Sequence, residues 1–91
     1  MDHRYQLDLY LSGIGSEEKK QIEVFDGLLH GMFKSQYFLK VIDVQEKPEL
    51  AQSENILATP AFVRVTPGPK KKFLVDLSSK EKMATRLELL R

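Results

Sequence analysis

Few side chains in this 91-residue sequence could carry out chemistry, and their types exclude most forms of catalysis. There is no cysteine, so a thiol nucleophile, a disulfide or a thiolate metal site cannot form. His3 and His30 lie far apart and have no carboxylates at metal-ligand spacing. Residues 13–16 (GIGS) lack the lysine and the longer glycine spacing of a phosphate-binding loop. We therefore expect no enzymatic activity, no metal and no cofactor.

Basic side chains are the remaining candidates for a functional role. Lys70, Lys71 and Lys72 concentrate positive charge, but the formal net charge of the chain is only +1. Tyr37 and Phe73 are not arrayed as a base-stacking platform, so we expect no nucleic-acid binding. The apolar runs are short and the N-terminal residues are charged and polar, which predicts neither a membrane span nor a secretory signal. A cytoplasmic location is the expectation that follows.

The first half of the chain has clear structural periodicity. Residues 5–11 (YQLDLYL) alternate between apolar and polar side chains, which predicts a half-buried strand. Ser16 is placed to cap a helix that ends near Lys34, because apolar residues then recur at helical spacing. Residues 37–44 are apolar on both faces and predict an interior strand. Together these elements predict a right-handed parallel βαβ unit.

The second half has shorter elements. Pro48 is a suitable first residue for a short helix that ends at about Asn55. Residues 61–65 and 72–77 are strand-like, and the TPGP turn between them predicts an antiparallel hairpin. Ser78 with Glu81 forms a capping-box pattern before a final helix. The predicted α/β order is βαβαββα, in one domain spanning residues 1–91.

This order is that of the thioredoxin-like fold, and the resemblance gives Pro60 a specific place. In that fold the third strand follows a cis proline that faces the start of the first helix. Thr59-Pro60 resembles this turn. Residues 12–16 occupy the position of the two thioredoxin cysteines, so the resemblance implies the scaffold without thiol–disulfide exchange.

Longer motifs resemble the KaiB family of circadian-clock proteins. They are "LKVIDVQEKPELAQSENILATPAFVRV", "TPGPKKK" and "DLSSKEKMATRLELL", and "LDLYLSG" resembles the opening strand of that family. The resemblance implies a regulator that binds a KaiC-like ATPase ring, modulates its phosphorylation cycle, and recruits or displaces a KaiA-like protein or clock histidine kinases. The alternative is a KaiB-like N-terminal sensory or docking domain of a clock histidine kinase.

The family also implies a change of fold. Its second half can adopt an alternative βαββααβ arrangement that assembles as a tetramer, so a homo-oligomer, either dimer or tetramer, is among the expectations. Pro67, Pro69, Val75 and Asp76 are the fold-switch candidates. Val75 replaces a glycine that the family usually has before Asp76, and valine does not readily adopt positive φ. The alternative is that Pro67 and Pro69 only rigidify a hairpin turn.

The same resemblance implies a basic partner surface. Its candidate residues are Lys20, Lys40, Arg64, Lys71 and Lys72. The alternative is that Lys40 and Arg64 simply face outward from strands and that residues 70–72 form a solvated turn. Asp8 departs from the family, which often has a lysine there, and the change would weaken any contact that needs positive charge on the first strand.

Overall fold

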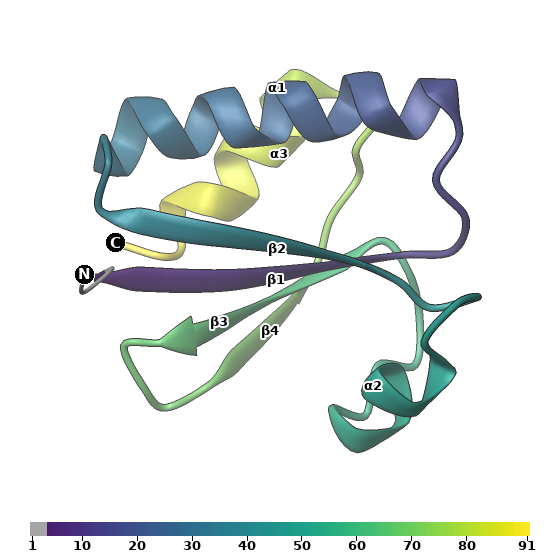
Figure 1. Ribbon diagram of the computed structural model, residues 1–91. Helices are drawn as coiled ribbons and strands as arrows, with labels where there is room; N and C mark the ends of the chain where they lie inside the picture. The colour runs from purple at the N-terminus through teal and green to yellow at the C-terminus, as the bar shows by residue number, and fades with distance from the viewer. Residues whose placement is uncertain (1–3) are drawn as a thin grey trace.

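The computed structural model describes residues 4–91, and its elements follow the expected βαβαββα order (Figure 1). His3 lies outside these described residues. The elements are β1 (Tyr5–Leu11), α1 (Ser16–Phe33), β2 (Tyr37–Asp43), α2 (Pro48–Ser53), β3 (Ala61–Thr66), β4 (Lys71–Leu74) and α3 (Lys80–Glu88).

The four strands form one mixed sheet in the order β2-β1-β3-β4. β1 is parallel to β2 and antiparallel to β3, and β3 is antiparallel to β4. The predicted parallel βαβ unit and the predicted hairpin are therefore both confirmed. β2 and β4 lie at the two edges of the sheet, so the expectation that residues 37–44 form an interior strand is wrong. These residues are apolar on both faces because Leu39 and Val41 pack on one face of the sheet and Ile42 on the other, although β2 has a neighbouring strand on one side alone within the described residues.

The main core lies between the sheet and the two helices that cover one of its faces, α1 and α3 (Figure 1). Leu7, Leu9 and Leu11 alternate along β1 onto this face and are almost fully buried. Burial of each leucine contributes about 1.5–3 kcal/mol relative to exposure. From β3, Phe62 packs edge-on against Phe25 of α1 and stacks on Phe73 of β4, with ring centroids 5.6 and 4.9 Å apart.

The opposite face of the sheet carries a smaller core. Tyr10, Ile42 and Val63 are buried there, and Leu50 and Ile56 from the region of α2 pack against them. Because α2 is short, it covers only part of this face, near one end of the sheet (Figure 1). This face, which we call the α2 face, consequently mixes apolar and charged side chains.

The helix caps differ from the sequence-based expectation by one residue each. Gly15, not Ser16, is the N-cap of α1, and its backbone N–H donates to Glu18 Oε1 at 2.8 Å. Ser79, not Ser78, is the N-cap of α3, and its Oγ accepts from the backbone N–H three residues on at 3.1 Å. Both errors arise because adjacent small residues suit the same cap equally well.

β4 ends at Leu74, three residues earlier than predicted. Val75 and Leu77 still point into the main core, which explains their strand-like pattern in the sequence. None of the helices in the described range 4–91 is both long enough and apolar enough to cross a membrane.

Candidate protein-interaction surface

The loop between β1 and α1 forms a shallow hollow opposite Pro60. Ser12, Gly13 and Gln21 line it together with Thr59 and Pro60, and its volume is about 280 Å³. The Thr59–Pro60 peptide bond is cis. The chain thus has the cis-proline turn and the facing loop that the thioredoxin-like resemblance implied, but the loop contains no cysteine.

Gly13 fixes the shape of this loop. Its φ of +89° suits glycine, and its N–H donates to Asp43 Oδ1 at 3.0 Å. The same carboxylate oxygen accepts from the backbone N–H of Gln45, also at 3.0 Å. The loop is therefore anchored to the end of β2.

The five candidate basic residues do not form a single patch. Lys40 and Lys72 lie on the α2 face, at the two edge strands. Arg64 and Lys71 lie opposite each other on β3 and β4, where strand alternation places them on the same face as Phe62 and Phe73, the face that the helices cover. Lys20 is exposed on α1 and lines a separate hollow beside the start of α3.

On the α2 face, one row of residues crosses the whole sheet. Lys40, Asp8, Val63 and Lys72 occupy equivalent positions on β2, β1, β3 and β4. A carboxylate and a valine therefore separate the two lysines. Because Lys40 and Lys72 lie on opposite edge strands, one small ligand cannot contact both. The row therefore suits a broad partner surface.

Asp8 itself lies in an unfavourable environment for a carboxylate. Partial burial raises its pKa above the usual value, although the Gln6 side chain and the Lys40 ammonium oppose the shift and Glu54 adds to it. Its Oδ1 is buried and has no hydrogen-bond partner among the residues that the structure describes. Burial, together with the charges of Asp8 and Glu54, also raises the pKa of Tyr10 to about 12.

Glu54 is an acidic neighbour that the sequence pattern did not identify. It follows α2 and forms an ion pair with Lys70, with Nζ and Oε2 3.0 Å apart. Lys70 is therefore partly neutralised, whereas Lys71 and Lys72 have no acidic group within ion-pair distance in the described part of the chain. Of these three lysines, Lys70 is therefore the one with an ion-pair partner in the described part of the chain.

Arg64 and Lys71 form an unusual cross-strand pair, because like charges placed directly opposite destabilise a sheet. Arg64 Nη2 donates to the carbonyl oxygen of Pro69 at 3.3 Å, while its Nε is buried and finds no hydrogen-bond partner within residues 4–91. Pro67 and Pro69 lie in the exposed hairpin turn, and the bonds before both are cis. The hydrogen bond to Pro69 thus holds the guanidinium of Arg64 close to the backbone of the turn.

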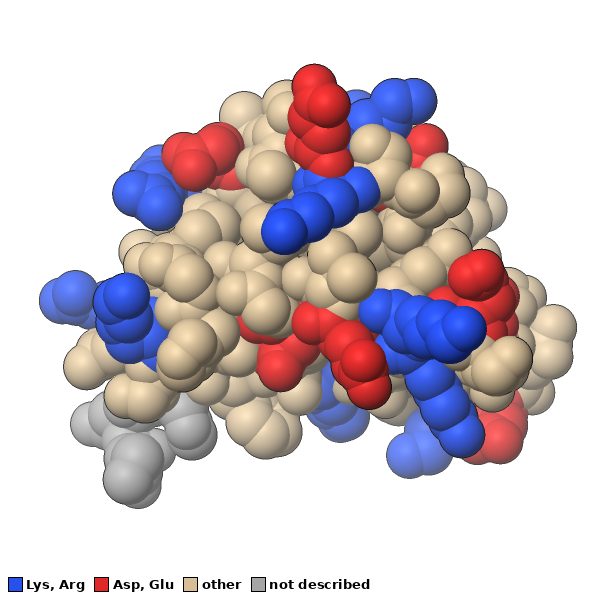
Figure 2. Space-filling model, turned by 90° about the horizontal axis from the view of Figure 1, so that it is seen from above, with Lys and Arg blue, Asp and Glu red and all other residues tan. Residues whose placement is uncertain are grey.

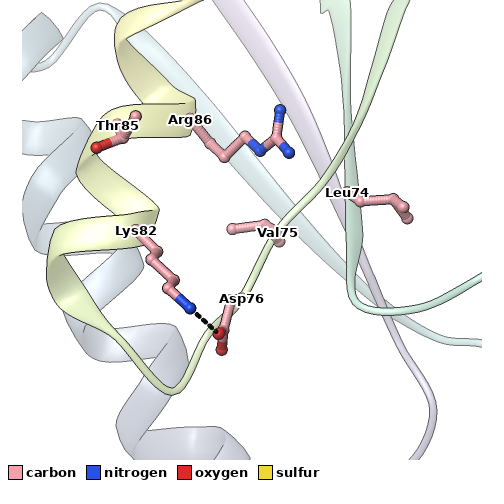
Figure 3. A pocket seen from close by; sticks show the side chains of 6 residues that line it. All are labelled: Leu74, Val75, Asp76, Lys82, Thr85 and Arg86. Atoms are coloured by element: carbon pink, nitrogen blue, oxygen red, sulfur yellow. Dashed lines mark ion pairs between the residues drawn. The ribbon is translucent and has the colours of Figure 1, made fainter.

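A larger hollow, of about 470 Å³, lies between the end of β4 and α3 (Figure 3). Its lining consists of Leu74, Val75, Asp76, Lys82, Thr85 and Arg86. Val75 is buried, and its N–H donates to the carbonyl oxygen of Pro60 at 3.1 Å. Leu74 points away from α3, whereas the Arg86 side chain extends from α3 toward the strand (Figure 3).

Asp76 organises the chain between β4 and α3. It accepts hydrogen bonds from the hydroxyl and the backbone N–H of Ser78, the latter at 2.9 Å, and lies 3.5 Å from Lys82 Nζ. These Ser78 hydrogen bonds, helped by Lys82, lower the pKa of Asp76. Sequence reasoning missed Lys82, Thr85 and Arg86 as a group, although their i, i+3 and i+4 spacing on one helix was an available signal.

Charge on the face covered by α1 is mixed. Basic and acidic side chains alternate over this surface and leave no large area of one sign (Figure 2). Within residues 4–91, no group of three or more histidine, aspartate or glutamate side chains is arranged to hold a metal ion.

Solved structures with the same architecture define the class of this protein. The chain is similar to the N-terminal domain of SasA from Synechococcus elongatus, with a TM-score of 0.72, 20% identity, and coverage of 96% of this chain and 82% of that one. It is equally similar in shape to the thioredoxin Deadhead of Drosophila melanogaster, with a TM-score of 0.72, 16% identity, and coverage of 99% and 84%. The protein therefore has a thioredoxin-like fold.

Sequence comparison identifies the family within that class. The KaiB domain family matches residues 8–89. The circadian clock oscillator protein KaiB of Thermosynechococcus vestitus is 40% identical over 86 residues, which cover 94% of this chain and 80% of that protein. The corresponding protein of a Picosynechococcus strain is 41% identical over 86 residues, with coverage of 94% and 83%. The chain belongs to the KaiB family.

Proposed function

We propose that this protein is a non-enzymatic cytoplasmic regulator that binds a KaiC-like ATPase ring and modulates its phosphorylation cycle. The observation that carries the proposal is the match of the KaiB domain to residues 8–89. The relatives at about 40% identity are named as circadian clock oscillator proteins, which supports a regulatory role. A KaiA-like protein or a clock histidine kinase would be a further partner.

The charges of the exposed surface support docking on a large partner. Lys71 and Lys72 are exposed and unpaired in the described chain, and they project to opposite faces of β4. Lys20 and Lys40 lie on other elements. A ring ATPase offers enough surface to contact such separated groups, whereas a small molecule does not.

The binding test is size-exclusion chromatography of this protein with a KaiC-like ATPase and ATP. We expect co-elution with the ring, weakened by Lys71→Glu combined with Lys72→Glu. Lys34→Glu combined with Lys47→Glu is the matched control, because it reverses two exposed lysines outside the proposed partner residues. If the wild-type protein elutes separately from the ring at high concentration of both, the proposal is wrong.

We also propose that residues 67–76 set the balance between the thioredoxin-like arrangement and an alternative fold that forms dimers or tetramers. Val75 is packed into the core, and Asp76 is held by Ser78 and Lys82. Val75 does not have positive φ, so the thioredoxin-like arrangement needs no glycine there. Valine at position 75, where the family usually has glycine, therefore favours the thioredoxin-like arrangement over one that would need positive φ there.

A sensory or docking domain of a clock histidine kinase is the second candidate. The similarity in shape to the SasA N-terminal domain supports it, although identity of 20% relates the two by fold alone. A kinase region encoded downstream in the same gene would favour this second candidate. Displacement of an isolated kinase sensor domain from the ATPase ring by this protein would favour the first.

A further inference from the structure

The outer edge of β4 is an open strand edge. β4 is the last strand of the sheet, and among residues 4–91 it pairs only with β3. An edge strand presents backbone N–H and C=O groups that can pair with an added strand. This edge is therefore able to accept an extended segment of another chain.

An apolar groove of about 260 Å³ adjoins this edge on the α2 face. Residues 55–58 form one wall, and Ala61, Phe73 and Leu74 complete the apolar lining, with Lys72 as its one charged member. Leu57 is 96% exposed and Leu74 is 57% exposed, so two large apolar side chains face solvent at the same place. Exposed apolar groups that gather beside a groove are typical of interaction sites.

The other face of the same edge is basic. Lys71 lies on this face, and Arg86 extends toward β4 from α3 across the hollow shown in Figure 3. Neither side chain has an ion-pair partner in the part of the chain that the structure describes, whereas Lys82 is paired with Asp76. Leu74 lines both the apolar groove and the basic hollow, so the two sites meet at this strand.

We infer that the β4 edge binds an extended peptide segment in which apolar and acidic side chains alternate. Successive side chains of an added strand point to opposite faces. Its apolar side chains would enter the groove beside Leu57, and its carboxylates would lie near Lys71 and Arg86. The occupant is a partner of opposite charge and not a second copy of β4, because two lysine-rich edges repel each other. The inference does not depend on the ATPase proposed above.

The test is selection from a random peptide library displayed on phage, with the whole protein as bait. We expect enriched peptides that alternate apolar and acidic residues. A fluorescently labelled enriched peptide should bind Leu74→Asp and Arg86→Glu about tenfold or more weakly, which corresponds to about 1.4 kcal/mol. Lys80→Glu is the matched control and should bind as the wild type does.

Amide NMR shifts on peptide addition should then be concentrated in residues 55–58 and 71–74. Circular dichroism checks that each variant is folded; if Leu74→Asp is not, the exposed Arg86 carries the test alone. The inference is overturned if no peptide is enriched, if enriched peptides lack acidic residues, or if Arg86→Glu binds them normally. It is also overturned if Lys80→Glu binds the peptide as weakly as the other two variants do. The same holds if the wild type is a homodimer and the only effect of Leu74→Asp is to dissociate it.

Discussion

Asp8 on β1 lies directly opposite Lys40 on β2, and both side chains belong to the α2 face of the sheet. The carboxylate offsets part of the positive charge of that face, yet its Oδ1 is buried without a hydrogen-bond partner. Asp8 therefore reduces the basic character of the surface at a cost to its own solvation.

Replacing Asp8 with asparagine should stabilise the protein near neutral pH. Because burial raises the pKa of Asp8 in the folded state, the ionised carboxylate disfavours folding at a pH well above that pKa. Partial exposure limits the gain to less than about 1 kcal/mol. As pH falls through the raised pKa and then the unfolded value, wild-type Asp8 is protonated and the advantage of asparagine disappears.

Urea denaturation of wild type and Asp8→Asn at about pH 7 and about pH 4 measures this difference, since the usual aspartate pKa is about 3.9. Lys40→Gln is a useful comparison. It removes a charge that favours the ionised carboxylate and should lower stability at the higher pH. An asparagine variant that is less stable than wild type at neutral pH would contradict the prediction.

Two tyrosines should ionise late in an alkaline titration. Burial raises the pKa of Tyr10 to about 12, and burial with the hydrogen bond to Asp26 raises the pKa of Tyr37 to about 12. Stability from these groups is complete below the unfolded pKa of about 10 and is lost as pH rises through the folded value. Tyrosinate absorbance should include a component that rises only at pH values well above about 10, and Tyr10→Phe and Tyr37→Phe should each reduce that component. Titration curves that are the same in the variants and the wild type would refute this prediction.

Glycine in place of Lys34 should stabilise the end of α1. Lys34 has φ 58° and ψ −123°, which a side chain disfavours and glycine adopts freely. We expect Lys34→Gly to exceed Lys34→Ala in stability by about 1 kcal/mol, because both remove the side-chain charge but only glycine relieves the backbone. Thermal or urea unfolding of the two variants measures this difference. An alanine variant as stable as the glycine variant would show that the backbone at position 34 is not strained.

Two adjacent serines give a test of the α3 cap. Ser79→Ala should cost about 1 kcal/mol, because it removes the acceptor for the Lys82 backbone N–H. Ser78→Ala should cost less, since it removes only an exposed hydroxyl contact with Asp76 and leaves the backbone N–H bond in place. The reverse order of stability would restore Ser78 as the cap.

The role of Val75 can be tested with two substitutions of similar size. Val75→Gly and Val75→Ala both lose buried contacts, but only glycine gains access to positive φ. We expect a second, slowly exchanging set of amide NMR peaks for the glycine variant and not for the alanine variant. One set of peaks from both variants, at all concentrations and temperatures, would count against a glycine-controlled change of fold.

The order and type of the elements could be predicted because their periodicity was clean. Leu7, Leu9 and Leu11 alternate along β1, although Tyr10 on its other face is also buried, and α1 has an apolar face that packs in the main core. The caps could not be placed to the residue, because Gly15 and Ser16, or Ser78 and Ser79, have similar capping preferences.

The interaction surface was less predictable than the fold. Strand alternation separates Lys71 from Lys72 only once Lys71 is known to lie on β4, which begins one residue before the predicted strand. By contrast, the row that joins Lys40 to Asp8 depends on strand register, and the ion pair of Glu54 with Lys70 depends on how α2 packs. Such contacts between distant residues leave no local pattern in a single sequence.

The central position of β1 has a consequence for synthesis on the ribosome. β1 pairs with β2 on one side and with β3 on the other, and it is the strand that connects the two halves of the sheet. The nascent chain can close β1 against β2 early, but the other side of β1 must wait until β3 emerges. Until then the first strand of the protein to be made keeps an unpaired edge, and such an edge is prone to pair with other chains.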